Sequence, residues 1–343
     1  MPLKFFSNYN KLILIGFIMQ EQESIKSIPT GRLQFFPIMM FAVVMGLSGL
    51  TLVFKRVSEV LFLPSFIPTL MMFISTAVFF TILYFYISKL IKYKDEVKKE
   101  FSHPIRINFF AASSISMLLL SMIYKHSIDE ISQIFFILGA VFHIFFTFYT
   151  IKFWINNNLE IVHSNPAWFI PIVGNLIVPI AGVGFLDNTV LNFYFSIGIF
   201  FWIILFSIIL NRIIFHNQFA PKFMPTLFIL IAPPSIGFIS YIKLTGSLDF
   251  FAQILFNLGL FFTILVFVMY KNFINIKFFI SWWAFTFPMA AITLATLLMY
   301  ELTNKWFYGL IAYILMSITT IIVVLVAIET IKHMRKKEIC IME

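Results

Sequence analysis

The sequence predicts an all-α integral membrane protein with ten transmembrane helices, and three observations carry this prediction. Ten apolar stretches, each about twenty residues long and free of Asp, Glu, Lys and Arg, fill residues 35 to 328. A helix rises about 1.5 Å per residue, so about twenty apolar residues cross the roughly 30 Å hydrocarbon layer. Hydrophobic residues make up 61% of the chain and charged residues 11%, against about 25% charged in a typical soluble chain. With 47 phenylalanines among 343 residues, this composition cannot build a water-facing surface.

The predicted spans follow one another with connections too short to fold into a soluble domain. They cover residues 35–54, 66–88, 107–123, 131–151, 167–186, 190–211, 223–242, 250–270, 278–300 and 306–328. We therefore expect a cytoplasmic N-terminal arm over 1–33, a channel or transporter domain over 34–330, and a short basic cytoplasmic tail over 331–343. The apolar run between Lys11 and Met19 is too short to span a bilayer, and Met19 is an alternative start.

The distribution of basic residues predicts the orientation. The side shared by both termini carries 19 Lys and Arg, and the other side carries 5. Under the positive-inside rule this places both ends in the cytoplasm of a multi-pass protein of the cell inner membrane. The net charge of +9 therefore reflects orientation and not nucleic-acid binding. The single cysteine, Cys340, excludes an intrachain disulfide and a thiolate metal site.

Prolines divide the spans into two kinds. Spans four, six, eight and ten contain none, and span two has one only at its entry. Proline frees a backbone carbonyl, which a membrane tolerates only where protein or water satisfies it, so we expect kinked odd helices inside and straight even helices outside. The alternative is that prolines are simply commoner in membrane helices. The prolines of the odd spans are Pro37, Pro104, Pro171, Pro179, Pro225, Pro233, Pro234 and Pro288.

The chain also repeats. Hairpins begin near residues 35, 104, 167, 222 and 278, and each pairs a proline-bearing helix with a proline-free one. This predicts five helical hairpins around an axis. Because five inner helices leave a central hole, we expect a pore.

The inner spans offer hydroxyl, small and aromatic side chains, Thr286 and Thr293 among them. His143 is the only ionisable residue within the spans apart from tyrosines, and a packing role is the favoured interpretation. Such a lining is neutral and weakly polar, so it suits an anion that must also leave; close helix packing is the alternative. Carbonyls freed by proline would repel an anion unless they point away from the axis. We expect basic residues at the cytoplasmic mouth to concentrate anions: Lys89, Lys92, Lys94, Lys98, Lys99 and Arg106.

The sequence contains no nucleotide-binding loop, metal-ligand spacing or Ser, His and Asp set that could meet on one side of the membrane. His103, His126 and His163 lie singly on separate loops, where solvated side chains are the better interpretation. We therefore expect neither an enzyme nor a cofactor.

Four segments of the odd spans resemble the tellurite-resistance/dicarboxylate transporter family, which includes TehA-like bacterial proteins, the plant slow-type (SLAC-type) anion channels and fungal malate and sulfite transporters. They are SWWAFTFPMAAITLAT at 281–296, PIMMFAVVMGLSGL at 37–50, NPAWFIPIVGNLIVPIAG at 165–182 and MPTLFILIAPPSIGFISY at 224–241. The resemblance covers roughly residues 29 to 335.

The resemblance implies a homotrimer in the lipid bilayer, with a pore in each protomer. It also implies that Phe287 projects into the pore as a gate; without the resemblance, a position facing lipid or packed in the core is the favoured interpretation for this phenylalanine. Phe41, Phe109 and Trp168 match aromatic positions on other inner helices. Two functions stay open: an anion channel, and a proton-coupled carrier of a C4-dicarboxylate, sulfite or tellurite. A membrane enzyme or scaffold is the third, least favoured hypothesis.

Overall fold

The computed structural model describes residues 31–61 and 64–341, and every regular element in these ranges is a helix. Most of the predicted N-terminal arm lies outside the described residues. Nine helices of the described ranges are long and apolar enough to cross a membrane. The prediction of an all-α integral membrane protein is therefore confirmed.

The first two hairpins occupy residues 32 to 156. Their elements are η1 (Arg32–Phe35), η2 (Ile38–Met40), α2 (Phe41–Leu61), α3 (Phe66–Lys92), α4 (Lys94–Phe101), η3 (Arg106–Phe109), α5 (Ala111–Tyr124) and α6 (Asp129–Asn156). The third hairpin comprises η4 (Ile161–His163), η5 (Pro166–Trp168), α7 (Phe169–Val173), η6 (Gly174–Leu176), α8 (Ile177–Gly182) and α9 (Asn188–Phe215). The last two comprise η7 (Pro221–Ile231), α10 (Ala232–Thr245), α11 (Phe250–Val268), α12 (Lys271–Ile274), η8 (Ile280–Phe285), α13 (Thr286–Thr303) and α14 (Trp306–Arg335). Here η denotes a 3₁₀ helix.

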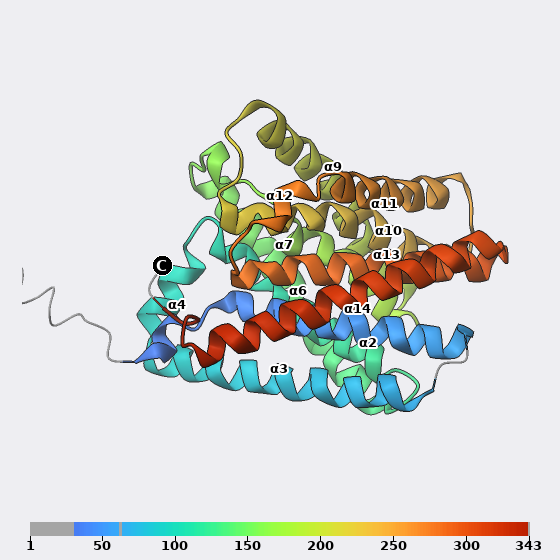
Figure 1. Cartoon of the computed structure of the whole chain (residues 1–343), viewed down its shortest axis with the longest axis horizontal. Coiled ribbons are helices and arrows are strands. Elements are labelled where there is room, and N and C mark those ends of the chain that lie inside the picture. Colours follow the sequence, from blue (N-terminus) through green and yellow to red (C-terminus); the bar gives the residue numbers. More distant parts are fainter. Residues whose placement is uncertain (1–30, 62–63, 342–343) are drawn as a thin grey trace, which may run out of the picture.

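The odd spans form a closed inner ring. Helix α2 contacts α5, α5 contacts α8, α8 contacts α10, α10 contacts α13, and α13 returns to α2. In the four long odd spans 67% to 83% of the apolar window is buried, whereas the even spans bury only 22% to 39%. The even helices α3, α6, α9, α11 and α14 thus form an outer layer, part of which is seen in Figure 1. The inner and outer roles predicted from proline parity match this arrangement.

The fifth span is shorter than the predicted 167–186. It is a composite of 3₁₀ and α-helical pieces over Pro166–Gly182. Pro166, Pro171 and Pro179 each remove a backbone donor, and this explains the change of helix type along the span. The span is buried throughout, so its short length is accommodated by neighbouring protein and not by lipid.

Every inner span contains 3₁₀ geometry at or near its start, in η2, η3, η5, η7 and η8. Runs of 3₁₀ helix longer than about four residues are uncommon, yet η7 extends over 11 residues with Pro225 inside it. Side chains satisfy some of the carbonyls so released. Thr147 of the outer helix α6 donates to the carbonyl oxygen of Pro171 at 2.7 Å. That carbonyl therefore points to the outer layer, away from the ring axis.

Glycines let α2 approach α13 closely. A Cβ on Gly46 would lie 2.2 Å from Oγ1 of Thr286 and 2.8 Å from the Trp283 ring. A Cβ on Gly49 would lie 2.9 Å from Cβ of Ala290. Only a residue without a side chain fits at either position, so these two helices pack backbone against side chain.

A buried ion pair fixes the start of the first inner span. Lys89 of α3 and Glu100 of α4 approach to 2.7 Å, and each side chain is only 4% exposed. Glu100 also accepts hydrogen bonds from the backbone N–H of Ile38 at 2.9 Å and from Tyr86 at 3.0 Å. Lys89 donates to the carbonyl of Phe36 at 2.8 Å. The expectation that Lys89 attracts anions at the mouth is therefore wrong, because its charge is neutralised inside the protein.

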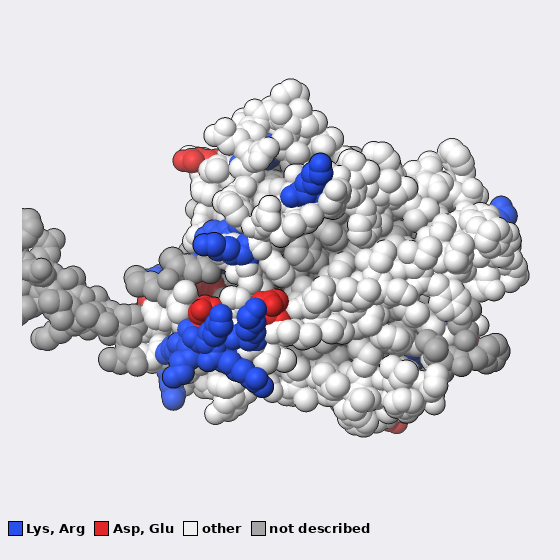
Figure 2. All heavy atoms as spheres, viewed as in Figure 1, with Lys and Arg blue, Asp and Glu red and all other residues white. Residues whose placement is uncertain are grey.

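Charged side chains gather at the end of the molecule where the chain terminates. On the face shown in Figure 2 this end carries a dense basic group, and a broad band across the middle is without charge. The start of the described chain and its C-terminus lie at this same end (Figure 1). We call the end of the ring on this side the near mouth and the opposite end the far mouth.

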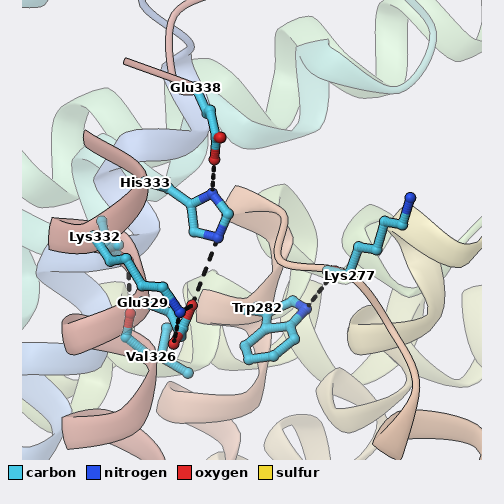
Figure 3. Close-up of polar contacts among 8 residues, drawn as sticks. Lys277, Trp282, Val326, Glu329, Lys332, His333 and Glu338 are labelled. Atoms are coloured by element: carbon cyan, nitrogen blue, oxygen red, sulfur yellow. Dashed lines mark hydrogen bonds and ion pairs between the residues drawn. The ribbon is translucent and has the colours of Figure 1, made fainter. Parts of the chain in front are cut away.

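The end of α14 is attached to the segment that leads into the ninth span. His333 lies between Glu338, which faces its Nδ1, and Glu329, whose Oε2 is 3.6 Å from its Nε2 (Figure 3). The Phe278 ring stacks on His333 with centroids 4.5 Å apart. Trp282 donates from Nε1 to the carbonyl of Lys277 at 3.1 Å. The C-terminal helix thereby holds the entry to η8.

Candidate functional site: a cavity inside the inner ring

A narrow cavity of about 60 Å³ lies inside the ring of inner helices. A water molecule needs about 10 to 15 Å³ on the same measure, so the cavity holds only a few waters. All five inner spans contribute to its wall. The lining residues are Met39, Ala42, Met45, Phe109, Ile115, Phe169, Ile170, Val173, Gly174, Ile177, Thr226, Ile229, Ala232, Pro233, Ile236, Ile280, Ser281, Trp283, Ala284, Phe287 and Pro288.

The wall is more apolar than the sequence suggested. Thr226 and Ser281 are the only hydroxyl-bearing residues among those that line the cavity, and both donate to carbonyls. Thr226 donates to Phe223 at 2.6 Å, and Ser281 donates to Lys222 at 2.5 Å. Most hydroxyls of the inner spans instead bond to a carbonyl three or four residues earlier, as Ser116 and Thr296 do. No charged residue is among those that line the cavity.

Phe287 lies in the first turn of α13, is 8% exposed and borders the cavity. Its ring packs close to α2, where Cδ2 is 3.4 Å from the position that a Cβ of Gly49 would take. Phe109, at the end of η3, borders the same cavity. Two aromatic residues that the sequence predicted to line a pore, Phe109 and Phe287, thus border the same cavity.

The other predicted pore-lining residues lie elsewhere, because the periodicity of their helices turns them toward neighbouring helices. Phe41 packs against Phe79 of the outer helix α3, with ring centroids 6.1 Å apart. Trp168 stacks on Trp154 of α6 at 4.7 Å.

Two threonines of α13 are also turned away from the cavity. Thr286 donates to the carbonyl of Trp283 at 2.7 Å and abuts Gly46. Thr293 donates to Met289 at 2.7 Å and lies 3.1 Å from Thr319 of α14. None of Phe41, Trp168, Thr286 and Thr293 is among the residues that line the cavity.

The five prolines predicted to kink the inner helices have different positions. Pro37 precedes η2, Pro171 and Pro179 lie within α7 and α8, and Pro233 and Pro288 lie in the first turns of α10 and α13. A proline in a first turn loses no intrahelical hydrogen bond. Pro233 and Pro288 therefore mark the change from 3₁₀ to α geometry, and both border the cavity.

His143 of α6 is fully buried between the third and fifth spans. Its Nδ1 lies 2.9 Å from Oγ of Ser114, and Ser114 donates to the carbonyl of Ala111 at 2.8 Å. With the serine hydrogen so used, Nδ1 is the donor and Nε2 is left as an acceptor. Nε2 has no hydrogen-bond partner within the described structure and lies against Gly174, a residue of the cavity wall.

Gly174→Ala is expected to destabilise the protein, because its methyl group would lie 2.3 Å from Cε1 of His143. Overpacking of this kind costs about 1 to 3 kcal/mol. The measurement is the melting temperature of the detergent-solubilised protein. Gly237→Ala is the matched control on another inner helix, since its nearest contact would be an ordinary 3.5 Å. Truncation of the ring by His143→Ala should restore part of the stability of Gly174→Ala; equal melting temperatures for the two glycine variants would contradict the close contact.

Histidines and basic residues that belong to separate connections in the sequence lie close together at the near mouth. Partial burial, followed by the charges of Arg106, His163 and Lys222, lowers the pKa of His103 below its usual 6.5. This shift favours the neutral form of His103, beside the basic side chains of Arg106 and Lys222. Each of these four residues stands just before or at the start of an odd span. Their proximity could therefore have been predicted from the sequence, because all odd spans start at the same end of the ring.

Within the described residues, no three His, Cys, Asp or Glu side chains are placed to hold a metal ion. The cavity and the two mouths are the features of the chain on which a function can be built. The cavity is enclosed by five helices and has an uncharged wall, and basic residues lie in the connections at both ends of the ring.

Comparison with known proteins places these features in a family. A family model described as voltage-dependent anion channel matches residues 35–331. The S-type anion channel SLAH3 of Arabidopsis thaliana is 27% identical over 310 residues, covering 87% of this chain and 48% of SLAH3. This chain thus spans about half the length of that relative.

Two microbial proteins are similar over most of their length. An uncharacterized transporter of Methanocaldococcus jannaschii is 27% identical over 291 residues, covering 76% of this chain and 84% of that protein. The tellurite resistance protein TehA homolog of Haemophilus influenzae is 24% identical over 259 residues, covering 73% and 77% of the two chains. The matched residues 35–331 extend from the end of η1 into α14 and so reach all five hairpins of the ring.

Proposed function

Because this chain belongs to the voltage-dependent anion channel family, whose members transport anions and are not enzymes, we propose that it is itself an anion channel. The observation that supports this most is the closed ring of five inner helices around an uncharged cavity. A cation would find no carboxylate in this wall. An anion would shed part of its water shell there and be held weakly enough to leave.

We infer that the near mouth faces the cytoplasm of a cell inner membrane, as the positive-inside distribution indicates. The inner helices begin at this mouth, and a helix N-terminus carries about half a positive charge. Arg106 and Lys222 place basic side chains close to these ends. The helix N-termini and the basic side chains both raise the local anion concentration, and added salt weakens this effect.

The cavity is narrow and lined by Phe109, Phe169 and Phe287, so a hydrophobic constriction is the proposed gate. Such a constriction blocks by bulk and by dewetting. Of the three rings, Phe287 is the most exposed, at 8% against 4% for Phe109 and 1% for Phe169. We propose Phe287 as the gating residue, in agreement with the family resemblance.

Anion selectivity without proton dependence is the expected result for purified protein in planar bilayers. Under a salt gradient the zero-current potential should lie near the anion equilibrium value and stay there when the pH on one side changes by a unit. Nitrate should permeate better than smaller, strongly hydrated anions, because an apolar wall repays little of the dehydration cost. A potential near the cation value would contradict the channel proposal.

One observation keeps a proton-coupled carrier as the second candidate. His143 is buried against the cavity wall at Gly174 with an unpaired Nε2, so it is an ionisable group next to the proposed path. Coupling through His143 predicts a zero-current potential that follows the proton gradient and loses that dependence in His143→Gln. The same recordings therefore separate the two mechanisms.

We further propose a homotrimer with one pore in each protomer. The outer helices expose many large apolar side chains, for example Phe145, Phe200 and Ile264 at 53%, 61% and 64%, which suit contact with lipid or with other protomers. The number three comes from the family resemblance alone. Native mass measurement of the complex in mild detergent should give three chains; a monomer or dimer would contradict the proposal.

A further inference from the structure

A second pocket, of about 510 Å³, lies at the near mouth, and none of its lining residues borders the cavity of the ring. One wall comes from the connection between α9 and the start of η7. The other comes from the connection that runs from α11 through α12 to η8. Ligand sites in proteins typically measure about 300 to 1,000 Å³, so this space can hold a small molecule or a headgroup. We call it the near-end pocket.

Basic and amide side chains line the near-end pocket. They are Gln218, Lys271, Asn272, Asn275 and Lys277. All five are exposed, and none of these side chains forms a hydrogen bond or ion pair within the described residues. Lysine and amide groups are hydrogen-bond donors, and lysine is a common ligand of phosphate.

The two connections that form the pocket contain no carboxylate. Residues 216–222 and 269–279 include Lys222, Lys271 and Lys277 but no Asp or Glu. The basic side chains at the pocket are therefore not balanced by acidic residues of their own segments. This composition favours an anionic ligand.

The acidic residues of neighbouring elements have other partners. Glu329 of α14, the outer helix that contacts η8, lies 3.1 Å from Lys332 and 3.6 Å from His333. Figure 3 shows the Lys277 side chain extending away from Glu329. Glu160 caps the short helix η4 with its own side chain.

The apolar part of the pocket wall is held from behind. Arg212, at the end of α9, is only 3% exposed and donates to the carbonyl of Asn217. Its guanidinium also lies 5.2 Å from the Phe219 ring, which lines the pocket. On the other side, Phe273 of α12 packs on Phe228 of η7 with ring centroids 5.2 Å apart. These contacts fix the two connections against the protein.

The pocket lies between the near ends of two outer helices. Helices α9 and α11 pack on each other through Phe206 and Phe262, with ring centroids 5.4 Å apart. At their near ends Phe215, Val268 and Ile274 are 65% to 72% exposed. Such apolar surface on an outer layer suits acyl chains, so the pocket lies where lipid headgroups lie.

We propose that the near-end pocket binds the headgroup of an anionic phospholipid. Its phosphate is held by Lys271, Lys277 and the amides, and its acyl chains lie along α9 and α11. Basic pockets at the membrane surface recognise lipid phosphates in this way. The bound headgroup joins the segments that lead into the seventh and ninth spans, so binding stabilises the folded protein. This inference is independent of which ion the protein conducts.

The test adds phosphatidylglycerol, or phosphatidylcholine with the same acyl chains, to the purified protein in mild detergent. Native mass spectrometry counts the bound lipids, and thermal melting measures stability. Phosphatidylglycerol should bind and raise the melting temperature, whereas phosphatidylcholine should do neither. Lys271→Met and Lys277→Met should each weaken phosphatidylglycerol binding about fivefold, and the double variant about twenty-five-fold. Both side chains are exposed, so the variants should melt like the parent in phosphatidylcholine.

Lys94→Met/Lys98→Met is the matched control, because it removes two exposed lysines from α4 at the same end. It should keep the parental affinity for phosphatidylglycerol, as should Lys271→Arg/Lys277→Arg.

Three results would overturn the proposal. The first is equal phosphatidylglycerol binding by the parent and Lys271→Met/Lys277→Met. The second is equal stabilisation of the parent by inorganic phosphate, which would assign the pocket to a soluble anion. The third is a double variant that loses chains from the complex but no lipid, which would make this surface a contact between copies. None of these results depends on anion current, so they leave the channel proposal to its own recordings.

Discussion

Phe287→Ala is expected to raise the anion conductance of the purified protein severalfold or more. The change deletes a ring from a cavity of only about 60 Å³, so the fractional gain in open volume is large. A hydrophobic constriction that excludes water should then fill and conduct. The measurement is the current in planar bilayers at matched amounts of reconstituted protein.

Phe285→Ala is the control for this variant. Phe285 is two residues away but packs against Phe228 at 4.7 Å and Phe273 at 5.8 Å, and it does not line the cavity. Its truncation should leave the conductance near the parental value. Equal currents from Phe287→Ala and the parent would show that Phe287 does not gate the path.

Glu100→Ala is expected to cause the largest loss of stability. It leaves the Lys89 ammonium 4% exposed and without its carboxylate partner, and it removes the acceptor of the Ile38 N–H. Breaking a buried pair from one side costs about 3 to 5 kcal/mol. The thermal melting curve of the solubilised protein measures this loss.

The same helix α4 offers the control, because Glu96 pairs with Lys99 at 2.7 Å on the surface. Glu96→Ala should change stability by no more than about 1 kcal/mol. The double variant Lys89→Met/Glu100→Gln removes both charges and should be more stable than Glu100→Ala. If Glu96→Ala and Glu100→Ala melt alike, the buried pair does not hold the start of the first inner span.

The sequence predicted the layers of this fold because proline and charge obey strong rules in a membrane. Freed carbonyls must be satisfied by protein, so the proline-bearing spans had to be internal, as the ring from α2 to α13 is. The C-terminal boundary of the fifth span was predicted less accurately. Its apolar composition continues to Leu186, but the helix ends at Gly182, because Gly184 after the cap residue takes a φ of +90°, which a helix cannot continue.

The cavity wall could be predicted only in part. Phe109 and Phe287 were found because they match aromatic positions of a family, whereas Thr286 and Thr293 were chosen for their hydroxyls. In an apolar setting a threonine hydroxyl bonds to its own helix, as both do, so a hydroxyl in an inner span does not signal a polar pore. The Lys89–Glu100 pair depends on which helix ends meet, and this required the structure.

The central claim is that anions pass through the cavity inside the five-helix ring. Its most direct test is cysteine modification during current recording in a Cys340→Ser background. Ala42→Cys and Ala284→Cys place a thiol on the cavity wall from two different spans, while Ala290→Cys faces α2 at Gly49. A small negatively charged thiol reagent should abolish the current at the first two positions, with recovery on reduction, and leave Ala290→Cys unaffected. Persistent current at Ala42→Cys and Ala284→Cys, with modification verified by mass, would contradict a path through this cavity.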